Sequence, residues 1–127
     1  MIRAFQNFLD EMNIPSGFVD AERTMLEFTI SDINYLYMYS AKDDPAYIRL
    51  MIPNVGAINE QSLQTMREIY NLTTSFKLGK AYIQNEQLWF VTEAFVYDRE
   101  NLTPLFQRML SVLRDMLNQF RTQNNGQ

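Results

Sequence analysis

The side chains that most often carry out catalysis are scarce in this sequence. It contains no histidine and no cysteine, which removes the most common general base, the most common transition-metal ligand and the thiolate nucleophile. Two pairs of adjacent carboxylates remain, Asp10–Glu11 and Asp43–Asp44. Because adjacent side chains point to opposite faces of a strand and diverge on a helix, neither pair forms an acid–base dyad by itself. We expect no catalytic residues, and a hydrolase that works with carboxylates alone is the least favoured function.

Metal and cofactor motifs are equally weak. Asp43 and Asp44 precede Pro45, a combination typical of a turn, and they lack the regular spacing of acidic residues that a calcium loop requires. None of the 4 glycines belongs to a phosphate-binding loop of the G-x-G-x-x-G or G-K-[ST] type. The sequence therefore predicts no bound metal, no cofactor and no enzyme activity.

Length and charge indicate one acidic domain. The chain has 127 residues, of which 46% are hydrophobic and 20% charged, a composition typical of a single globular domain. Because its net charge is −4, the chain lacks the positive electrostatic field that nucleic-acid binding needs. No apolar run reaches the roughly 18–20 residues of a membrane span, and Asp10 and Glu11 interrupt any signal-peptide core. We expect a cytoplasmic domain over residues 1–121 and a flexible polar tail over 122–127, with neither nucleic acid nor membrane as a partner.

The apolar spacing changes from helical to strand-like in the N-terminal half. Apolar side chains recur with helical spacing over residues 2–13, and Pro15 and Gly17 then favour a turn. Residues 18–53 contain three runs with a period of two, separated by polar turns, which predict an antiparallel meander. Pro53 is expected to end the third strand.

The C-terminal half is predicted to add a helix, a hairpin and a second helix. A narrow apolar stripe predicts a helix over about 59–73, and Asn85–Glu86 is expected to join two strands within residues 75–97. Thr103 is a candidate N-cap for a long amphipathic helix that should cover the sheet. The order α-β-β-β-α-β-β-α predicts an α+β fold with a five-stranded antiparallel sheet and helices mainly on one face. The strand order stays open.

The face of the meander that points away from the helices is predicted to be rich in tyrosine and methionine. With Leu36 and Met38 placed under the helices, the other face carries Met25, Tyr35, Tyr37, Tyr39, Tyr47 and Met51. Tyrosine combines a large contact area with a polar tip, and methionine adapts to varied partners. This face is therefore a candidate partner-binding surface. Cross-strand tyrosine pairing that stabilises an exposed face explains it equally well.

The arrangement of elements resembles a known fold. Residues 71–117 (NLTTSFKLGKAYIQNEQLWFVTEAFVYDRENLTPLFQRMLSVLRDML) run from a predicted helix end through a strand, a short polar turn and a second strand into a helix. This stretch is similar to YbjN-like proteins, and the whole pattern resembles the fold that they share with class I type III secretion chaperones. The resemblance implies a homodimer without enzyme activity. It places the dimer contact at Leu63, Met66 and Tyr70 and the client surface on the tyrosine–methionine face.

These observations predict a non-enzymatic protein-binding module, chaperone-like or regulatory. It is expected to act as a homodimer that binds a segment of another protein. The alternative is a small-molecule-binding or sensory α+β domain with a pocket between sheet and helix. That pocket would be lined by Trp89, Phe90, Phe95 and Tyr97.

Overall fold

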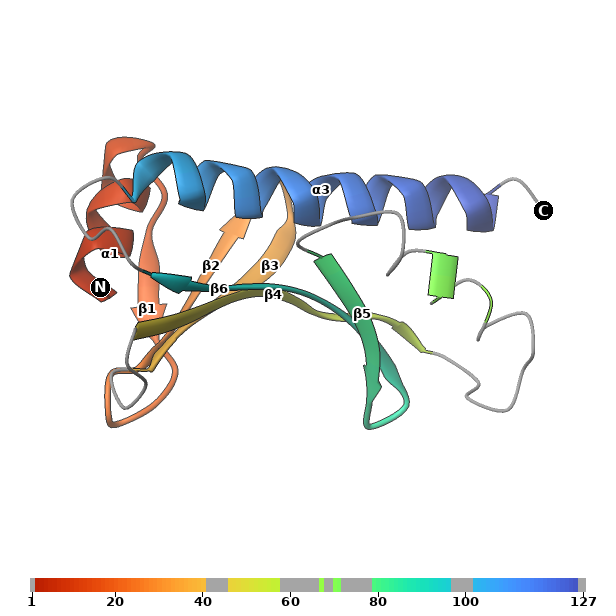
Figure 1. Cartoon of the computed structure of the whole chain (residues 1–127), viewed down its shortest axis with the longest axis horizontal. Coiled ribbons are helices and arrows are strands. Elements are labelled where there is room, and N and C mark those ends of the chain that lie inside the picture. Colours follow the sequence, from red (N-terminus) through yellow and green to blue (C-terminus); the bar gives the residue numbers. More distant parts are fainter. Residues whose placement is uncertain are drawn as a thin grey trace.

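A computed structural model of the chain describes residues 2–40, 46–57, 67, 70–71, 79–96 and 102–125. Its strands form one antiparallel six-stranded sheet in the order β1-β2-β3-β4-β6-β5, with α1 and α3 on the same face (Figure 1). The elements are α1 (Ile2–Glu11), β1 (Ser16–Phe18), β2 (Met25–Ile30), β3 (Ile33–Ser40), β4 (Ala46–Ala57), β5 (Gly79–Gln84), β6 (Gln87–Val96) and α3 (Thr103–Asn125). The predicted α+β class is confirmed, with six strands in place of the predicted five.

The first helix ends two residues earlier than predicted, at Glu11. Asn13 adopts a left-handed conformation with φ of 59°. The backbone N–H of Ile14 donates to the carbonyl of Leu9, and that of Asn13 donates to the carbonyl of Asp10, each at 3.0 Å. This pair of bonds is the Schellman motif, in which asparagine replaces the more common glycine after the helix.

The additional strand, β1, is three residues long and pairs with β2. Ser16 lies opposite Phe28, and Phe18 lies opposite Leu26. Pro15 and Gly17 are turn-forming residues in isolation, so local preference predicted a turn where tertiary pairing forms a short edge strand.

Two of the hairpins have two-residue turns with left-handed backbones. Ser31 and Asp32 join β2 to β3 with φ of 51° and 66°, and Asn85 and Glu86 join β5 to β6 with φ of 52° and 64°. Positive φ at both central residues defines the type I′ turn, whose twist matches the twist of the flanking strands. The predicted hairpin at Asn85–Glu86 is confirmed.

The hairpin of β5 and β6 joins the meander through its second strand, because β6 pairs with β4. Pro53 does not end β4, contrary to the prediction. The strand continues to Ala57, and the register with β6 shifts between Ile52, opposite Phe90, and Gly56, opposite Leu88. Proline is tolerated at such an irregularity because no regular ladder bond is required there.

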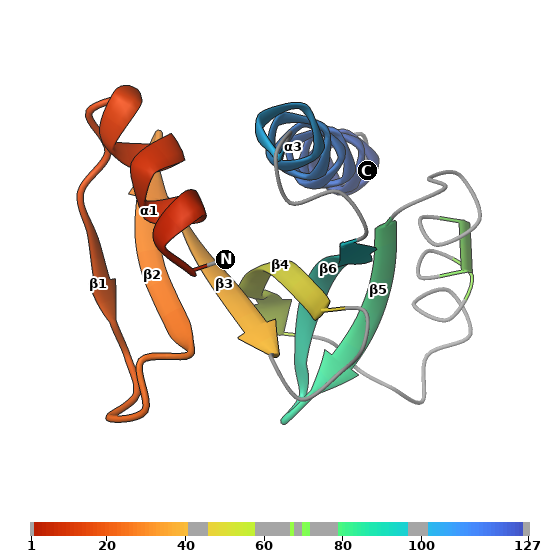
Figure 2. The same ribbon diagram turned by 60° about the vertical axis from the view of Figure 1, so that its left-hand side comes forward.

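The last helix covers the sheet, as predicted. Figure 2 looks nearly along α3 and shows β1 and β2 to one side of it, β4 and β6 beneath it and β5 toward the other side, so the sheet curves around the helix. The carbonyl of Leu102 accepts the first helical bond from Phe106 N–H at 2.9 Å, which places the N-cap at Leu102, one residue before the predicted Thr103. The helix runs to Asn125, so residues 122–125 of the predicted tail are helical.

The apolar stripe of α3 forms one core with α1 and the inner side of the sheet. Its buried members are Phe106, Met109, Leu113, Met116 and Leu117. No helix among the described residues is both long enough and apolar enough to cross a membrane. The predicted helix over about 59–73 lies mostly outside the described residues, although Arg67, Tyr70 and Asn71 are helical.

Candidate functional site

The two faces of the sheet are distinguished by its register. Leu26 lies opposite Tyr37, and Phe28 lies opposite Tyr35, and directly opposed residues share a face. The inner face, which packs against α1 and α3, therefore carries these tyrosines together with Tyr39, which lies opposite Ile48. The prediction that Tyr35, Tyr37 and Tyr39 lie on the partner-binding surface is wrong.

Tyr37 is part of an aromatic cluster in the core. It is fully buried, and its ring stacks on that of Phe5 from α1 with 4.0 Å between centroids and 2° between planes. Phe106 from α3 meets Phe5 edge to face at 4.9 Å. Burial raises the pKa of the Tyr37 phenol well above its ordinary value of 10.0, and burial also raises the pKa of Tyr35. Tyr37 joins the sheet to both helices, and neither buried tyrosine offers surface to a partner.

The opposite side of the sheet, called the outer face below, carries the odd-numbered positions of β2 and of residues 47–51 in β4. It also carries the even-numbered positions 34–40 of β3 and 80–84 of β5, and the odd-numbered positions of β6. The predicted surface residues Met25, Tyr47 and Met51 lie here. Leu36 and Met38, predicted to lie under the helices, are their neighbours on this face. Neither α1 nor α3 covers it (Figure 1).

Glu93 is the centre of a polar network on the outer face. Its carboxylate accepts hydrogen bonds from the Tyr47 hydroxyl and from Lys80 Nζ. Arg49 Nε lies 3.6 Å from Glu93 Oε2. The hydrogen bonds from Lys80 and Tyr47 hold the pKa of the Glu93 carboxyl below its ordinary value of 4.5. Because each polar partner lies on a neighbouring strand, the network ties β4, β5 and β6 together.

Two apolar side chains beside this network are buried although no described helix covers them. Met51 is 4% exposed and Val91 is fully buried, and the two lie opposite each other in the register of β4 and β6. Arg49 and Glu93 are their neighbours along the same strands, and Lys80 lies opposite Val91. The aliphatic stems of these long charged side chains can cover apolar surface while their heads stay in water.

Other apolar groups remain accessible on the outer face. Phe95 is 53% exposed, and the centroid of its ring lies 5.4 Å from the centroid of the Tyr47 ring. Trp89 and Tyr82 form a nearly parallel pair with 6.1 Å between ring centroids. The indole Nε1 of Trp89 is buried without a hydrogen-bond partner in the described part of the chain. A buried donor without an acceptor is costly, so this side of the sheet is not fully satisfied.

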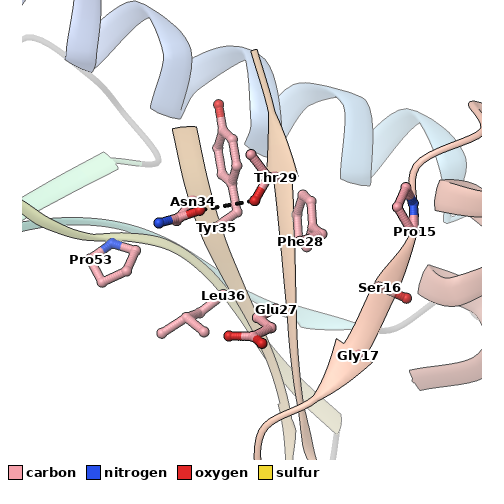
Figure 3. Close-up of a pocket in the computed structure, with 10 residues that line it drawn as sticks. All are labelled: Pro15, Ser16, Gly17, Glu27, Phe28, Thr29, Asn34, Tyr35, Leu36 and Pro53. Atoms are coloured by element: carbon pink, nitrogen blue, oxygen red, sulfur yellow. Dashed lines mark hydrogen bonds between the residues drawn. The ribbon is translucent and has the colours of Figure 1, made fainter. Parts of the chain in front are cut away.

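A hollow of about 470 Å³ lies at the β2–β3 end of the outer face (Figure 3). Its lining includes Glu27, Leu36 and Pro53, and Thr29 donates a hydrogen bond to the Asn34 side-chain oxygen at 2.9 Å. Glu27 is the one carboxylate in this lining, so the hollow holds no acid–base pair. Across the described ranges, no group of three acidic, histidine or cysteine side chains could hold a metal ion.

The described residues reach only part of the predicted dimer contact. Tyr70 is helical and 68% exposed. Leu63 and Met66 lie outside the described residues. The dimer contact therefore stays a prediction.

The residues predicted to line a pocket between sheet and helix do not lie together. Phe90 is fully buried in the core, where its ring meets Phe120 of α3 edge to face at 5.9 Å. Trp89 and Phe95 belong to the outer face, because successive strand residues point to opposite sides. Tyr97 lies outside the described residues.

No protein-family model and no curated protein sequence matches the chain. Among solved structures, its fold is similar to that of YbjN from E. coli, a protein proposed to be a transcription regulator. The match has a TM-score of 0.63 and 10% sequence identity, and it covers 98% of this chain and 93% of the YbjN chain. The YbjN-like part of the predicted resemblance is thus confirmed at the level of the fold, and the resemblance to secretion chaperones stays a prediction.

Proposed function

We propose that this chain is a non-enzymatic protein-binding module, chaperone-like or regulatory, whose binding surface is the outer face of the sheet. The observation that carries the proposal is the exposure of Phe95 on a sheet face that neither described helix covers. The half-buried side chains of Met25, Met38 and Trp89 lie on the same face. Aromatic and methionine side chains are enriched in protein interfaces, where they provide contact area and adaptable packing.

The chemistry of the face favours binding over catalysis. Its best-defined carboxylate, Glu93, is engaged by a tyrosine and a lysine and is held in its ionised form. A general acid or base needs a pKa near the working pH, and the shift here has the opposite direction. Glu93 therefore has a structural role in this proposal: it holds neighbouring strands of the outer face together and does not act as a general acid or base.

A regulatory role fits the charge of the chain best if the direct partner is a protein. YbjN, which shares the fold, is proposed to regulate transcription. The present chain has a net charge of −4, and an acidic domain is repelled by the phosphate backbone of DNA. Any effect on transcription would then pass through another protein in the cytoplasm.

The test removes apolar contacts from the outer face without touching the core. The double variant Phe95→Ser with Met38→Ser and the wild-type chain are tagged, used to capture proteins from source cells, and compared by quantitative mass spectrometry. Val19, which is 45% exposed in the loop between β1 and β2, provides the control Val19→Ser. We expect the double variant to lose a captured protein that the control retains. Identical captured sets from folded variants would refute the outer face as the binding surface.

A second candidate function is small-molecule binding in the hollow at the β2–β3 end of the outer face. The hollow combines an apolar side chain, Leu36, with the polar groups of Glu27, Thr29 and Asn34, a mixture typical of ligand sites. A ligand that binds only the folded chain raises its melting temperature. A metabolite screen by thermal shift tests this candidate, and Thr29→Trp, which should fill the hollow, should abolish any shift.

A further inference from the structure

Four side chains of the hollow at the β2–β3 end of the outer face lie next to one another. Glu27 and Thr29 are two residues apart on β2, and the register places Leu36 opposite Glu27 and Asn34 opposite Thr29. Residues two apart on a strand share a face, and so do residues that are directly opposed. Pro53 of β4 adds a second aliphatic group to the lining (Figure 3). The hollow therefore combines a carboxylate, a hydroxyl and an amide with an aliphatic wall.

A glycine leaves space beside the carboxylate. Gly17 of β1 lies opposite Glu27, and a Cβ at this position would have nothing within 4 Å. Any larger side chain here would share the face of Glu27 and fill part of the hollow. The backbone does not require glycine, because its φ is not positive. The effect of this residue is therefore to keep the hollow open next to Glu27.

The charge of the hollow favours a cation. Glu27 is the one charged residue in the lining. Within the described residues it forms no ion pair, whereas Arg49 and Lys80, the cations of the outer face, both lie against Glu93. The net charge of −4 adds a field that attracts positive groups.

The hydrogen-bonding groups favour a primary ammonium over other cations. The Thr29 hydroxyl donates to the Asn34 side-chain oxygen at 2.9 Å, so the lone pairs of Thr29 Oγ1 remain as acceptors beside the Glu27 carboxylate. A primary ammonium has three donors and no acceptor, which matches these oxygens. Calcium would need about six to eight oxygen ligands. A quaternary ammonium would need accessible aromatic faces, but Phe28 and Tyr35, the aromatic residues of the lining, are each only 4% exposed.

We propose that the hollow binds an alkylammonium group, with the ammonium on Glu27 and Thr29 and the aliphatic stem along Leu36 and Pro53. The inference rests on the second candidate function, because it names the ligand class of the same hollow. An exposed ion pair alone contributes little, so contact of the stem with the aliphatic wall supplies part of the affinity. The group has two chemical sources: a free alkylamine, or a lysine side chain of a protein that binds the outer face.

The experiment separates the charge from the stem. Hexylamine carries both, hexanol carries the stem without the charge, and methylamine carries the charge without the stem. Each is titrated into the isotope-labelled chain, and the backbone amide signals are followed by NMR. We expect hexylamine to bind more tightly than either of the others and to move the amide signals of β2 and β3 around the hollow.

Matched variants test the two features that carry the proposal. Glu27→Gln removes the charge at nearly constant shape and should weaken hexylamine binding about tenfold. Glu22→Gln makes the same change at an exposed position outside the strands, and it should change the affinity by less than about twofold. Gly17→Leu keeps Glu27 but occupies the space beside it, so it should abolish binding. Urea unfolding confirms that each variant is folded under the assay conditions.

A lysine derivative with both backbone ends capped as amides distinguishes the two sources of the ammonium. If it binds as tightly as hexylamine, the hollow accepts a lysine side chain of a protein. If hexylamine binds about tenfold more tightly or better, the ligand is a free alkylamine.

Three results would overturn the proposal: hexylamine that binds no more tightly than hexanol, equal losses in Glu27→Gln and Glu22→Gln, or shifted amide signals confined to regions away from the hollow. The second candidate function has its own readout. If a metabolite without an amine raises the melting temperature of the wild type but not of Thr29→Trp, the hollow binds a ligand and only the ammonium is refuted. If no compound, hexylamine included, shifts the melting temperature, both are refuted, and the capture experiment still tests the outer face independently.

Discussion

On the inner face of the sheet, helices cover the apolar side chains. Thr92 is the single buried polar residue among the described residues, and its hydroxyl donates a hydrogen bond to the Leu50 carbonyl at 3.1 Å. On the outer face, Met51 and Val91 are buried beside a network of charged and hydroxyl groups. Both faces come from the same alternating strands. The inner face excludes water with another layer of secondary structure, whereas the buried side chains of the outer face lie beside long charged residues, whose stems can cover apolar surface.

Under the proposed function, this difference assigns stability to the inner face and partner binding to the outer face. The inner side chains are fixed by close packing, so a partner cannot reach them without unfolding the domain. The outer side chains are held by a few partly exposed polar contacts, which contribute little individually and can rearrange when a partner binds. A surface of this kind can be altered with small loss of stability. Variants on the two faces measure that contrast, and the largest effect is expected in the core.

Tyr37 and Tyr47 provide a matched pair across the two faces. Tyr37→Ala removes a ring that stacks on Phe5 and leaves a cavity in the core, so the free energy of unfolding should fall by about 3–5 kcal/mol. Tyr47→Ala removes a half-buried ring and one hydrogen bond to Glu93, and its cost should be about 1–2 kcal/mol. Urea unfolding followed by circular dichroism measures both. Equal losses would mean that the outer face is packed as tightly as the inner one.

The sequence does not reveal which side chains of β3 point into the core. Alternation correctly predicts three strands of the meander, but the period of two does not say which half of each strand points inward. In β3, Leu36 and Met38 are the more hydrophobic set, and hydrophobicity alone places them in the core. The register set by the tight turn at Ser31–Asp32 turns them outward, opposite Glu27 and Met25.

The core cluster explains why that register is favoured. Phe5 and Phe106 offer flat aromatic surfaces to the strand, and the ring of Tyr37 stacks on Phe5. Aromatic pairs gain from such geometry beyond the area they bury. This preference depends on residues about thirty and seventy positions away along the chain, so no local pattern reveals it. The local signals that did succeed were the alternation in the meander strands, the turn at Asn85–Glu86 and the stripe of the last helix.

Gly79 tests how closely the inner face approaches α3. A Cβ at this position would collide with Met116 Sδ and lie 3.1 Å from Val112 Cγ1. Gly79→Ala should therefore lower the free energy of unfolding by about 1–3 kcal/mol, since overpacking forces side chains or backbone to move. Gly17→Ala is the control, because nothing lies within 4 Å of a Cβ there. A Gly79→Ala chain as stable as the Gly17→Ala chain would show that Met116 moves aside freely.

Glu93 tests the network of the outer face through pH. Because its folded pKa is lowered from 4.5, its ionised form contributes stability above the unfolded pKa, and this contribution is lost as the pH falls from there through the folded pKa. Glu93→Gln should therefore flatten the pH dependence of unfolding below about pH 5 and cost about 1 kcal/mol at neutral pH. Parallel pH curves for wild type and Glu93→Gln would contradict the network.

The smallest effect is expected at a turn that belongs to neither face. Glu86 has φ of 64° in the type I′ turn between β5 and β6, a conformation that costs a residue with a side chain roughly 1 kcal/mol more than glycine. Glu86→Gly should therefore raise the free energy of unfolding, by about 0.5 kcal/mol once the added freedom of the unfolded chain is subtracted. Gln84→Gly, in the adjacent strand, should lower it instead. If both glycine variants destabilise the chain equally, the positive φ of Glu86 does not lower the stability of the folded chain. Contacts on the two faces alone then fix the register of the hairpin.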